Sequence, residues 1–222
     1  EATEIKQQLN EVKDSLSIKG WRELLFVHES ALEEINTKLY ILNEEYKTIH
    51  DYNPIEHIKD RVKTPKSIIE KMERKGIEVK IDNARKYIHD IAGVRIICSF
   101  TTDIYKLYKL LEKQTDIEVL EVKDYIKNPK PNGYKSLHMI VQIPVFLTDK
   151  IEKVKIEIQI RTIAMDFWAS LEHKIYYKYQ GEAPDDIPNQ LKECADMITD
   201  LDDKMLEIRR KLHQFEKNKN EI

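Results

Sequence analysis

The chain has 222 residues, of which 41% are hydrophobic, and this is enough for one sizeable domain with a buried core. Its 37 Lys and Arg residues against 40 Asp and Glu give a net charge of −3, which argues against general nucleic-acid binding and leaves any anionic ligand to a local cluster of cations. Two cysteines without metal spacing, no run near the roughly 18 apolar residues of a membrane span and no signal peptide together predict a cytoplasmic protein without membrane association.

Helices are predicted for the N-terminal residues 1–50. Gly20 is expected to separate two helical segments, and residues 51–54 are expected to end the second one. Apolar residues of the second segment recur at steps of four and three, which places them on one helix face. These residues are His28, Leu32, Ile35, Leu39, Leu42, Tyr46 and Ile49.

A further helix is predicted to begin at Thr64-Pro65, an N-cap residue followed by a first-turn proline, and to stop near Gly76. Its residues Ser67, Lys71 and Arg74 share one polar face. This face is either a solvated basic surface or part of an anion site.

The middle of the chain changes from helical to strand-like periodicity. A strand, a helix and then three strands predict a mixed sheet of the α/β (α+β) class. The predicted segments are strand 93–100, helix 103–113 and strands 117–126, 136–147 and 154–161.

After Arg161 the pattern returns to helix over residues 162–179. The last helix carries an apolar stripe with alternating steps of three and four, which indicates either packing on its own domain or a subunit contact. The stripe contains Leu191, Cys194, Ile198, Leu201, Met205, Ile208, Leu212 and Phe215.

Common phosphate-binding and metal motifs are absent from the sequence. There is no G-x-x-x-x-G-K-[ST], G-x-G-x-x-G, H-E-x-x-H or C-x-x-C. A nucleotide would therefore have to be held by side chains rather than by a glycine-rich loop.

The stretch "NPKPNGYKSLH" (residues 128–138) places charged and aromatic side chains where a turn opens into a strand. Tyr134 and His138 share one parity and are expected ~13 Å apart along one strand face. Such a pair is either structural or suited to the two ends of a nucleotide, with Lys130 and Lys135 beside it.

The strand "KVKIEIQIR" (residues 153–161) alternates an apolar face with a polar one. Glu157 lies on the polar face between Lys155 and Gln159, so it is either part of an ordinary half-exposed strand or a metal ligand or proton acceptor. In "HDIAGVRI", Asp90 precedes a strand that contains Arg95. The His-Asp pair alone is weak evidence for a metal phosphohydrolase.

Four blocks in fixed order resemble the synthetase domain of the RelA/SpoT homologue family, in particular its small single-domain members, the small alarmone synthetases of the RelP and RelQ types. The blocks are "RVKTPKSIIEK", "HDIAGVRI", "NPKPNGYKSLH" and "EIQIRTIAMDFWASLEH". The resemblance implies a nucleotidyltransferase-like, largely antiparallel sheet. It divides the chain into N-terminal helices (1–50), a synthetase domain (51–180) and a C-terminal helix (187–222).

This family transfers pyrophosphate from ATP to the 3′-hydroxyl of GDP or GTP, releasing AMP. The resemblance implies Mg²⁺ bound by Asp90 and Glu157, with Glu157 also the general base. It implies adenine between Arg61 and Arg95, with Lys63, Ser67, Lys71 and Arg74 on the donor phosphates. For the acceptor it implies guanine stacked on Tyr134, phosphates near Lys130 and His138, and Asp166 lining the guanine pocket.

The resemblance further implies a homo-oligomer, expected to be a tetramer, without the hydrolase domain of the long family members. Two other functions stay open: a nucleotidyltransferase that moves AMP, and a non-catalytic nucleotide- or RNA-binding module. Because a ring face needs no hydroxyl to stack on guanine, replacing Tyr134 by Phe is expected to preserve guanine-nucleotide affinity. The preference between GDP and GTP is not fixed by the sequence.

Overall fold

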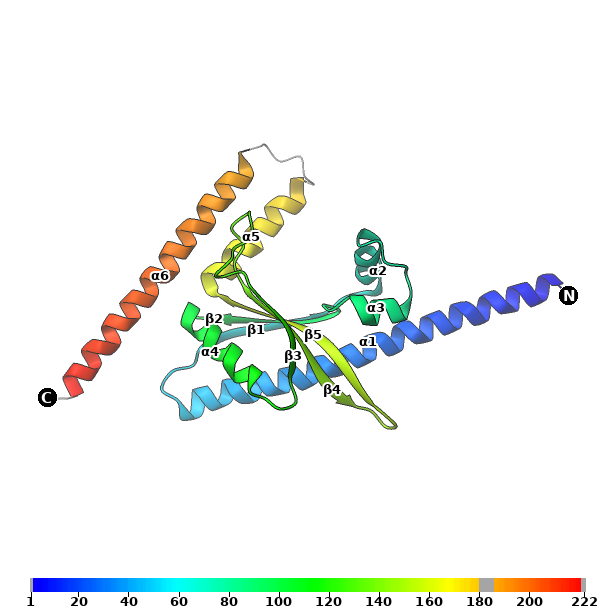
Figure 1. Cartoon of the computed structure of the whole chain (residues 1–222), viewed down its shortest axis with the longest axis horizontal. Helices are drawn as coiled ribbons and strands as arrows, with labels where there is room; N and C mark the ends of the chain where they lie inside the picture. The colour runs from blue at the N-terminus through cyan, green and yellow to red at the C-terminus, as the bar shows by residue number, and fades with distance from the viewer. Residues whose placement is uncertain (1, 180–185, 221–222) are drawn as a thin grey trace.

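The computed structural model describes residues 2–179 and 186–220, in which a five-stranded sheet is flanked by helices (Figure 1). In chain order the elements are α1 (Ala2–Ile49), β1 (Ile55–Val62), α2 (Pro65–Arg74), α3 (Ile81–Tyr87), β2 (Ala92–Cys98), α4 (Thr101–Glu112), β3 (Glu118–Asp124), β4 (Leu137–Phe146), β5 (Ile151–Thr162), α5 (Ile163–Tyr179) and α6 (Ile187–Asn220).

The sheet has the strand order β1-β2-β5-β4-β3. Only β2 and β5 pair in parallel, while the other three neighbouring pairs are antiparallel. This confirms the predicted mixed, largely antiparallel α/β (α+β) fold. The four predicted strands are present, with ends displaced by three residues or fewer.

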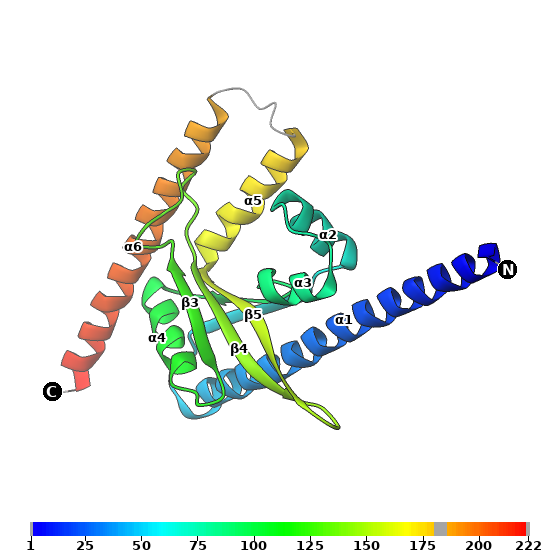
Figure 2. The ribbon, with the colours of Figure 1, turned by 45° about the vertical axis from the view of Figure 1, so that its right-hand side comes forward.

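One face of the sheet is apolar and is covered by α1 and α4 (Figure 2). In β4 and β5 every second side chain is buried in this core, as the sequence alternation predicts. Ile35 and Leu39 of α1 pack there against strand residues such as Ile158. The polar side chains of the same strands consequently share the opposite face.

A second apolar cluster fixes α2 beside the polar face. Ile68 and Met72 of α2 are fully buried against Leu24 of α1 and Ile88, which follows α3. The N-terminus of α2 is capped as predicted, because the Thr64 hydroxyl accepts a hydrogen bond from the Ser67 amide at 3.3 Å. Helix α2 can therefore hold its basic side chains in a defined position.

The prediction that Gly20 separates two helices is wrong. Helix α1 is continuous, and a Cβ atom at position 20 would overlap the Cδ1 of Ile81, so glycine allows α3 to approach closely. One glycine in a long helix costs about 1 kcal/mol, which packing readily offsets. The expected buried face of α1 is present from His28 to Tyr46, whereas Ile49 is exposed.

Two elements were not predicted, the strand β1 and the short helix α3. Strand β1 has mostly exposed residues and a charged sequence, IEHIKDRV, which is typical of edge strands and lacks a clear alternation. Helix α3 has only seven residues, too few for a helical period to show.

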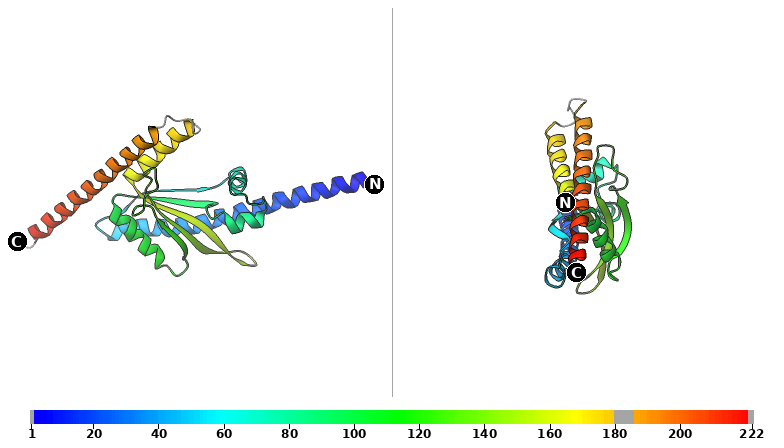
Figure 3. Two further views of the ribbon diagram at one scale, coloured as in Figure 1. Left: turned by 45° about the horizontal axis from the view of Figure 1, so that its top comes forward. Right: turned by 90° about the vertical axis from the view of Figure 1, so that its left-hand side faces the viewer.

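The apolar contacts of helix α6 with its own domain are made by its first part, whereas farther along the helix Arg209 pairs with Asp103 of α4 and lies over the rings of Tyr52 and Phe100. Leu191, Ala195 and Ile198 contact Trp168 of α5, whereas Cys194 is exposed, contrary to its place in the predicted stripe. From Leu201 to Phe215 the stripe residues are 43–67% exposed. Helices α1 and α6 extend from the sheet in opposite directions (Figure 3). No helix in the described ranges is long and apolar enough to cross a membrane.

Candidate active site

A cleft of about 220 Å³ opens on the polar face of the sheet, where β1, β2 and β5 lie side by side. It contains both predicted catalytic carboxylates, Asp90 and Glu157, and three of the predicted ATP-binding cations. The full lining is Lys59, Asp60, Arg61, Lys63, Asp90, Gly93, Val94, Arg95, Glu157 and Gln159.

Asp90 lies just before β2 and is held by two lysines. Its Oδ2 accepts hydrogen bonds from Lys63 Nζ at 2.7 Å and Lys71 Nζ at 2.5 Å. Burial works to raise the pKa of Asp90, but the two lysines outweigh it and hold the pKa at about 2. Within the described residues its Oδ1 is buried without a hydrogen-bond partner, so this oxygen is available to a cation.

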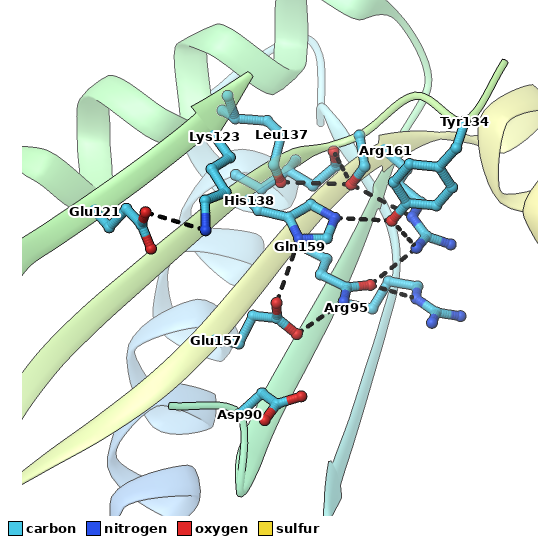
Figure 4. A network of polar contacts seen from close by, with 12 residues as sticks. Asp90, Arg95, Glu121, Lys123, Tyr134, Leu137, His138, Glu157, Gln159 and Arg161 are labelled. Carbon is cyan, nitrogen blue, oxygen red and sulfur yellow. Dashed lines mark hydrogen bonds and ion pairs between the residues drawn. The ribbon is translucent and has the colours of Figure 1, made fainter. Parts of the chain in front are cut away.

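Glu157 stands at the centre of β5 and is held from two sides (Figure 4). Its Oε1 lies 3.3 Å from His138 Nδ1, and its Oε2 accepts a hydrogen bond from Gln159 Nε2 at 2.9 Å. Burial opposes ionisation, yet these partners lower the pKa of Glu157 below its ordinary value. Glu157 is therefore an ionised carboxylate at neutral pH, able to bind a cation or accept a proton.

Arg61 and Arg95 line the same cleft from adjacent strands. Arg95 is fixed by hydrogen bonds to Asp166 Oδ1 at 3.2 Å and Gln159 Oε1 at 3.4 Å. Ser67 and Arg74 lie on exposed parts of α2 and are not among the ten lining residues within the described chain. Of the predicted α2 cations, only Lys71 touches Asp90.

The turn before β4 brings Lys130, Tyr134 and His138 together. The rings of Tyr134 and His138 lie 5.8 Å apart, and Lys130 Nζ lies 4.8 Å from the Tyr134 ring centre. The expected separation of ~13 Å along one strand face is wrong, because β4 begins only at Leu137. Tyr134 precedes the strand, and after the turn at Gly133 its ring meets the His138 ring edge-on.

Arg161 received no role from the sequence, although the alternation of β5 placed it on the polar face with Glu157. It is only 4% exposed and donates from Nη2 to the Tyr134 hydroxyl oxygen at 2.5 Å. Its Nη1 lies 3.2 Å from Asp166 Oδ1, the same oxygen that Arg95 contacts. Asp166 Oδ1 thus bridges two arginines, while its Oδ2 lies 4.0 Å from Lys59 Nζ, beyond hydrogen-bond distance.

The loop that carries Tyr134 is held by α5 and α6. Lys135 Nζ donates to Thr199 Oγ1 at 2.7 Å, and Asn132 Nδ2 donates to Glu172 Oε1 at 3.1 Å. Gly133 has a φ of +87°, and a Cβ there would lie 2.5 Å from the Cβ of Ala195. The loop and α6 are therefore in direct steric contact.

Comparison with known proteins supports the resemblance. The family model described as "Region found in RelA / SpoT proteins" matches residues 60–182. The chain is 52% identical to the GTP pyrophosphokinase YwaC of Bacillus subtilis over 195 residues, covering 88% of this chain and 93% of that protein. It is 38% identical to the GTP pyrophosphokinase YjbM of the same organism over 191 residues, covering 86% and 89%.

Solved structures give the same picture. The small alarmone synthetase 2 from Bacillus subtilis matches with a TM-score of 0.79 and 52% identity, over 86% of this chain and 98% of that one. The small alarmone synthetase 1 from Bacillus subtilis, bound to its product pppGpp, matches with a TM-score of 0.82 and 37% identity, over 88% and 99%.

Replacing Gly133 by Ala tests whether the loop geometry serves the guanine nucleotide that the resemblance implies. The left-handed backbone costs an alanine about 1–2 kcal/mol, and the new Cβ would meet Ala195. We expect GDP affinity to fall about 5–30-fold, measured by calorimetric titration, with ATP affinity unchanged. Gly76→Ala is the matched control. Gly76 also has a positive φ (+66°), but a Cβ added there would stand in open space. Equal GDP binding by both variants would contradict the assignment.

Proposed function

Because the chain belongs to the RelA/SpoT family, we propose that it is a (p)ppGpp synthetase that transfers pyrophosphate from ATP to the 3′-hydroxyl of GDP or GTP and releases AMP. The observation that carries this proposal is the cleft in which Asp90 and Glu157 stay ionised among lysines and arginines. The relatives named GTP pyrophosphokinases and the relative bound to pppGpp support it.

Glu157 is the group best placed to activate the acceptor. A 3′-hydroxyl is a poor nucleophile, and an ionised carboxylate can orient it and accept its proton during attack on the β-phosphorus of ATP. Lys63 and Lys71 hold Asp90 and bring positive charge to the donor phosphates. The planar guanidinium groups of Arg61 and Arg95 suit stacking on adenine.

Asp90 and Glu157 fit a magnesium ion. Among residues 2–179 and 186–220, no cluster of three or more His, Cys, Asp or Glu side chains could hold a metal by itself. Mg²⁺, however, is often bound by one or two carboxylates together with substrate phosphates and water. The unpartnered Oδ1 of Asp90 offers such a ligand, and a bound Mg²⁺ would neutralise phosphate charge during transfer.

On the acceptor side, we assign the guanine to the face of Tyr134 and the phosphates to Lys130, with His138 near them. Lys130 Nζ lies over the rings of both Tyr134 and Tyr125, at 4.8 and 4.9 Å from their centres. An incoming base would displace Lys130 from the Tyr134 ring and leave its ammonium group free for a phosphate. Asp166, through Oδ2, remains the proposed partner of the guanine edge.

Incubation with labelled ATP, GDP or GTP and Mg²⁺, followed by chromatography, tests the proposed function. AMP and a 3′-pyrophosphorylated guanine nucleotide are expected products. Release of pyrophosphate would instead indicate adenylyl transfer, and an unchanged mixture would indicate a binding module. Stability of the product on prolonged incubation tests the expectation that the chain does not hydrolyse it. The nucleotide substrates make the cytoplasm the expected location.

Replacing Glu157 by Gln should abolish the proposed base while preserving the shape of the cleft. We expect kcat to fall ~10²–10⁴-fold, the usual contribution of a general base, with ATP affinity within a few-fold of the parent protein. Steady-state kinetics and calorimetry measure the two quantities. Near-normal turnover would remove Glu157 from the mechanism.

Replacing Tyr134 by Ala should injure acceptor binding selectively. Stacking of a base on an aromatic ring is worth ~1–3 kcal/mol, so GDP or GTP affinity should fall about 5–150-fold. ATP affinity should change little, and Tyr134→Phe should retain the affinity for the guanine nucleotide. Calorimetric titration measures the affinity for each nucleotide. An equal loss of affinity for ATP and for the guanine nucleotide would indicate that Tyr134 is only structural.

We also propose that the exposed stripe of α6 is a subunit contact in a homotetramer. Met205, Ile208 and Leu212 line a groove of about 810 Å³ between α6 and α4, and apolar surface of this kind is typical of interaction sites. Light scattering should show a tetramer, and Leu201→Glu/Ile208→Glu should dissociate it. The control Lys211→Glu/Gln214→Glu, exposed on the same helix outside the stripe, should remain assembled. A monomeric parent protein at micromolar concentration would refute the proposal.

A further inference from the structure

Four side chains form one continuous line of polar contacts through the site (Figure 4). Arg161 Nη2 lies 2.5 Å from the Tyr134 hydroxyl oxygen, which lies 2.7 Å from His138 Nε2. The other ring nitrogen, His138 Nδ1, lies 3.3 Å from Glu157 Oε1. The line therefore joins the acceptor loop to the proposed general base.

The two ends of this line fix the direction of every hydrogen bond when the imidazole is neutral. A guanidinium can only donate, and an ionised carboxylate can only accept. Glu157 must thus accept a hydrogen bond from His138 Nδ1–H, which leaves Nε2 as an acceptor. The Tyr134 hydroxyl, which accepts from Arg161, then donates to Nε2. Burial raises the pKa of Tyr134, so this phenol keeps its proton.

We propose that Arg161 and the Tyr134 hydroxyl are positioning groups that hold His138 in its Nδ1–H tautomer and thereby orient Glu157 for proton abstraction. This inference rests on the proposed function of Glu157 as the general base. It gives Tyr134 two separate tasks, one for the ring face and one for the hydroxyl. It also gives a role to Arg161, which the sequence left unassigned.

Several hydrogen bonds and an ion pair hold the Arg161 guanidinium in place, so it anchors one end of this line. Besides Tyr134, its guanidinium donates to Gln159 Oε1 at 3.0 Å and to Ser136 Oγ at 3.4 Å, and it pairs with Asp166. A planar donor with partners on several sides cannot rotate without breaking other bonds. Since Glu157 and Arg161 lie on the same strand, the spacing between the two ends of the line is set by β5 itself.

A consequence is that the base is fully oriented only when the acceptor loop is in place. Tyr134 belongs to the loop that carries the guanine-binding groups, whereas Glu157 belongs to the rigid sheet. Without the phenol, His138 can carry its proton on Nε2 and turn a lone pair toward the Glu157 carboxylate. The base then loses one of its two hydrogen-bond donors.

The tautomer can be observed directly by ¹⁵N NMR of the histidine side chains in the intact, ligand-free protein. The chain has seven histidines, and a His138→Gln spectrum identifies the relevant signals. Spectra are recorded at a pH at which the imidazole is neutral, and there we expect the parent protein to show the Nδ1–H form and Tyr134→Phe to lose it. Arg161→Met should give a mixture that Arg161→Lys, which keeps a donor, reverses. An Nε2–H form in the parent, or Nδ1–H in every variant, would overturn the proposal.

Tyr125→Phe is the matched control for Tyr134→Phe. The Tyr125 ring packs edge-on against His138 at 5.2 Å, but no hydrogen bond of its hydroxyl is found within the described residues. Its replacement should leave the tautomer and turnover as in the parent. A Tyr125→Phe variant that alters the tautomer as much as Tyr134→Phe does would show that ring packing, not the hydroxyl, is responsible.

Kinetics supply the second readout. In Tyr134→Phe we expect kcat to fall roughly tenfold, less than the ~10²–10⁴-fold effect of losing a base outright, with the KM for GDP within about twofold of the parent. A raised KM at unchanged kcat would contradict a positioning role for the hydroxyl. If the parent makes no (p)ppGpp, the proposed function fails, whereas the NMR result still judges the hydrogen-bond line independently.

Discussion

Two carboxylates have to stay charged in a partly buried cleft, and the arrangement of the site follows from this constraint. Burial favours the neutral acid at both Asp90 and Glu157, yet the pKa of each is lowered. Asp90 is ionised because Lys71 of α2 and Lys63, which directly follows β1, both pair with it. Glu157 is ionised because neighbouring strand positions supply an imidazole and an amide. The cations thus stabilise the carboxylates before any phosphate is bound, which allows a protein of net charge −3 to present a site for polyanions.

Strand β5 sets the spacing of the polar side chains in this site. It lies in the middle of the sheet, so neighbours on both sides fix its position. Glu157, Gln159 and Arg161 project from the same face at two-residue intervals, and they contact His138, Arg95 and Tyr134 in turn. The apolar residues between them are buried under α1, and this burial opposes a register slip that would turn the polar set into the core.

The parts of the molecule with a strong local signal could be predicted from the sequence, and these include four strands, the capped start of α2 and the polar parity of Glu157 and His138. The edge strand β1 could not, because its charged residues satisfy no core-facing alternation. Continuity of α1 through Gly20 depends on contact with α3, which is tertiary information. The closeness of Tyr134 to His138, and the partners of Arg161, depend on how a turn folds back. No sequence periodicity reports how the turn folds back. Only the structure therefore shows which of the predicted residues hydrogen-bond to one another.

The contact between Gly133 and Ala195 joins the active-site loop to a helix that also presents the exposed stripe. The space between the two residues holds the Cα hydrogen of Gly133 on one side and the methyl group of Ala195 on the other. In a set of homologous sequences the two positions should therefore covary in size, because a larger side chain at either one requires a displaced helix or a displaced loop. An exchange that shifts the helix axis would move the proposed guanine-binding loop and the apolar stripe together, so evolutionary change at one of these surfaces would be linked to change at the other.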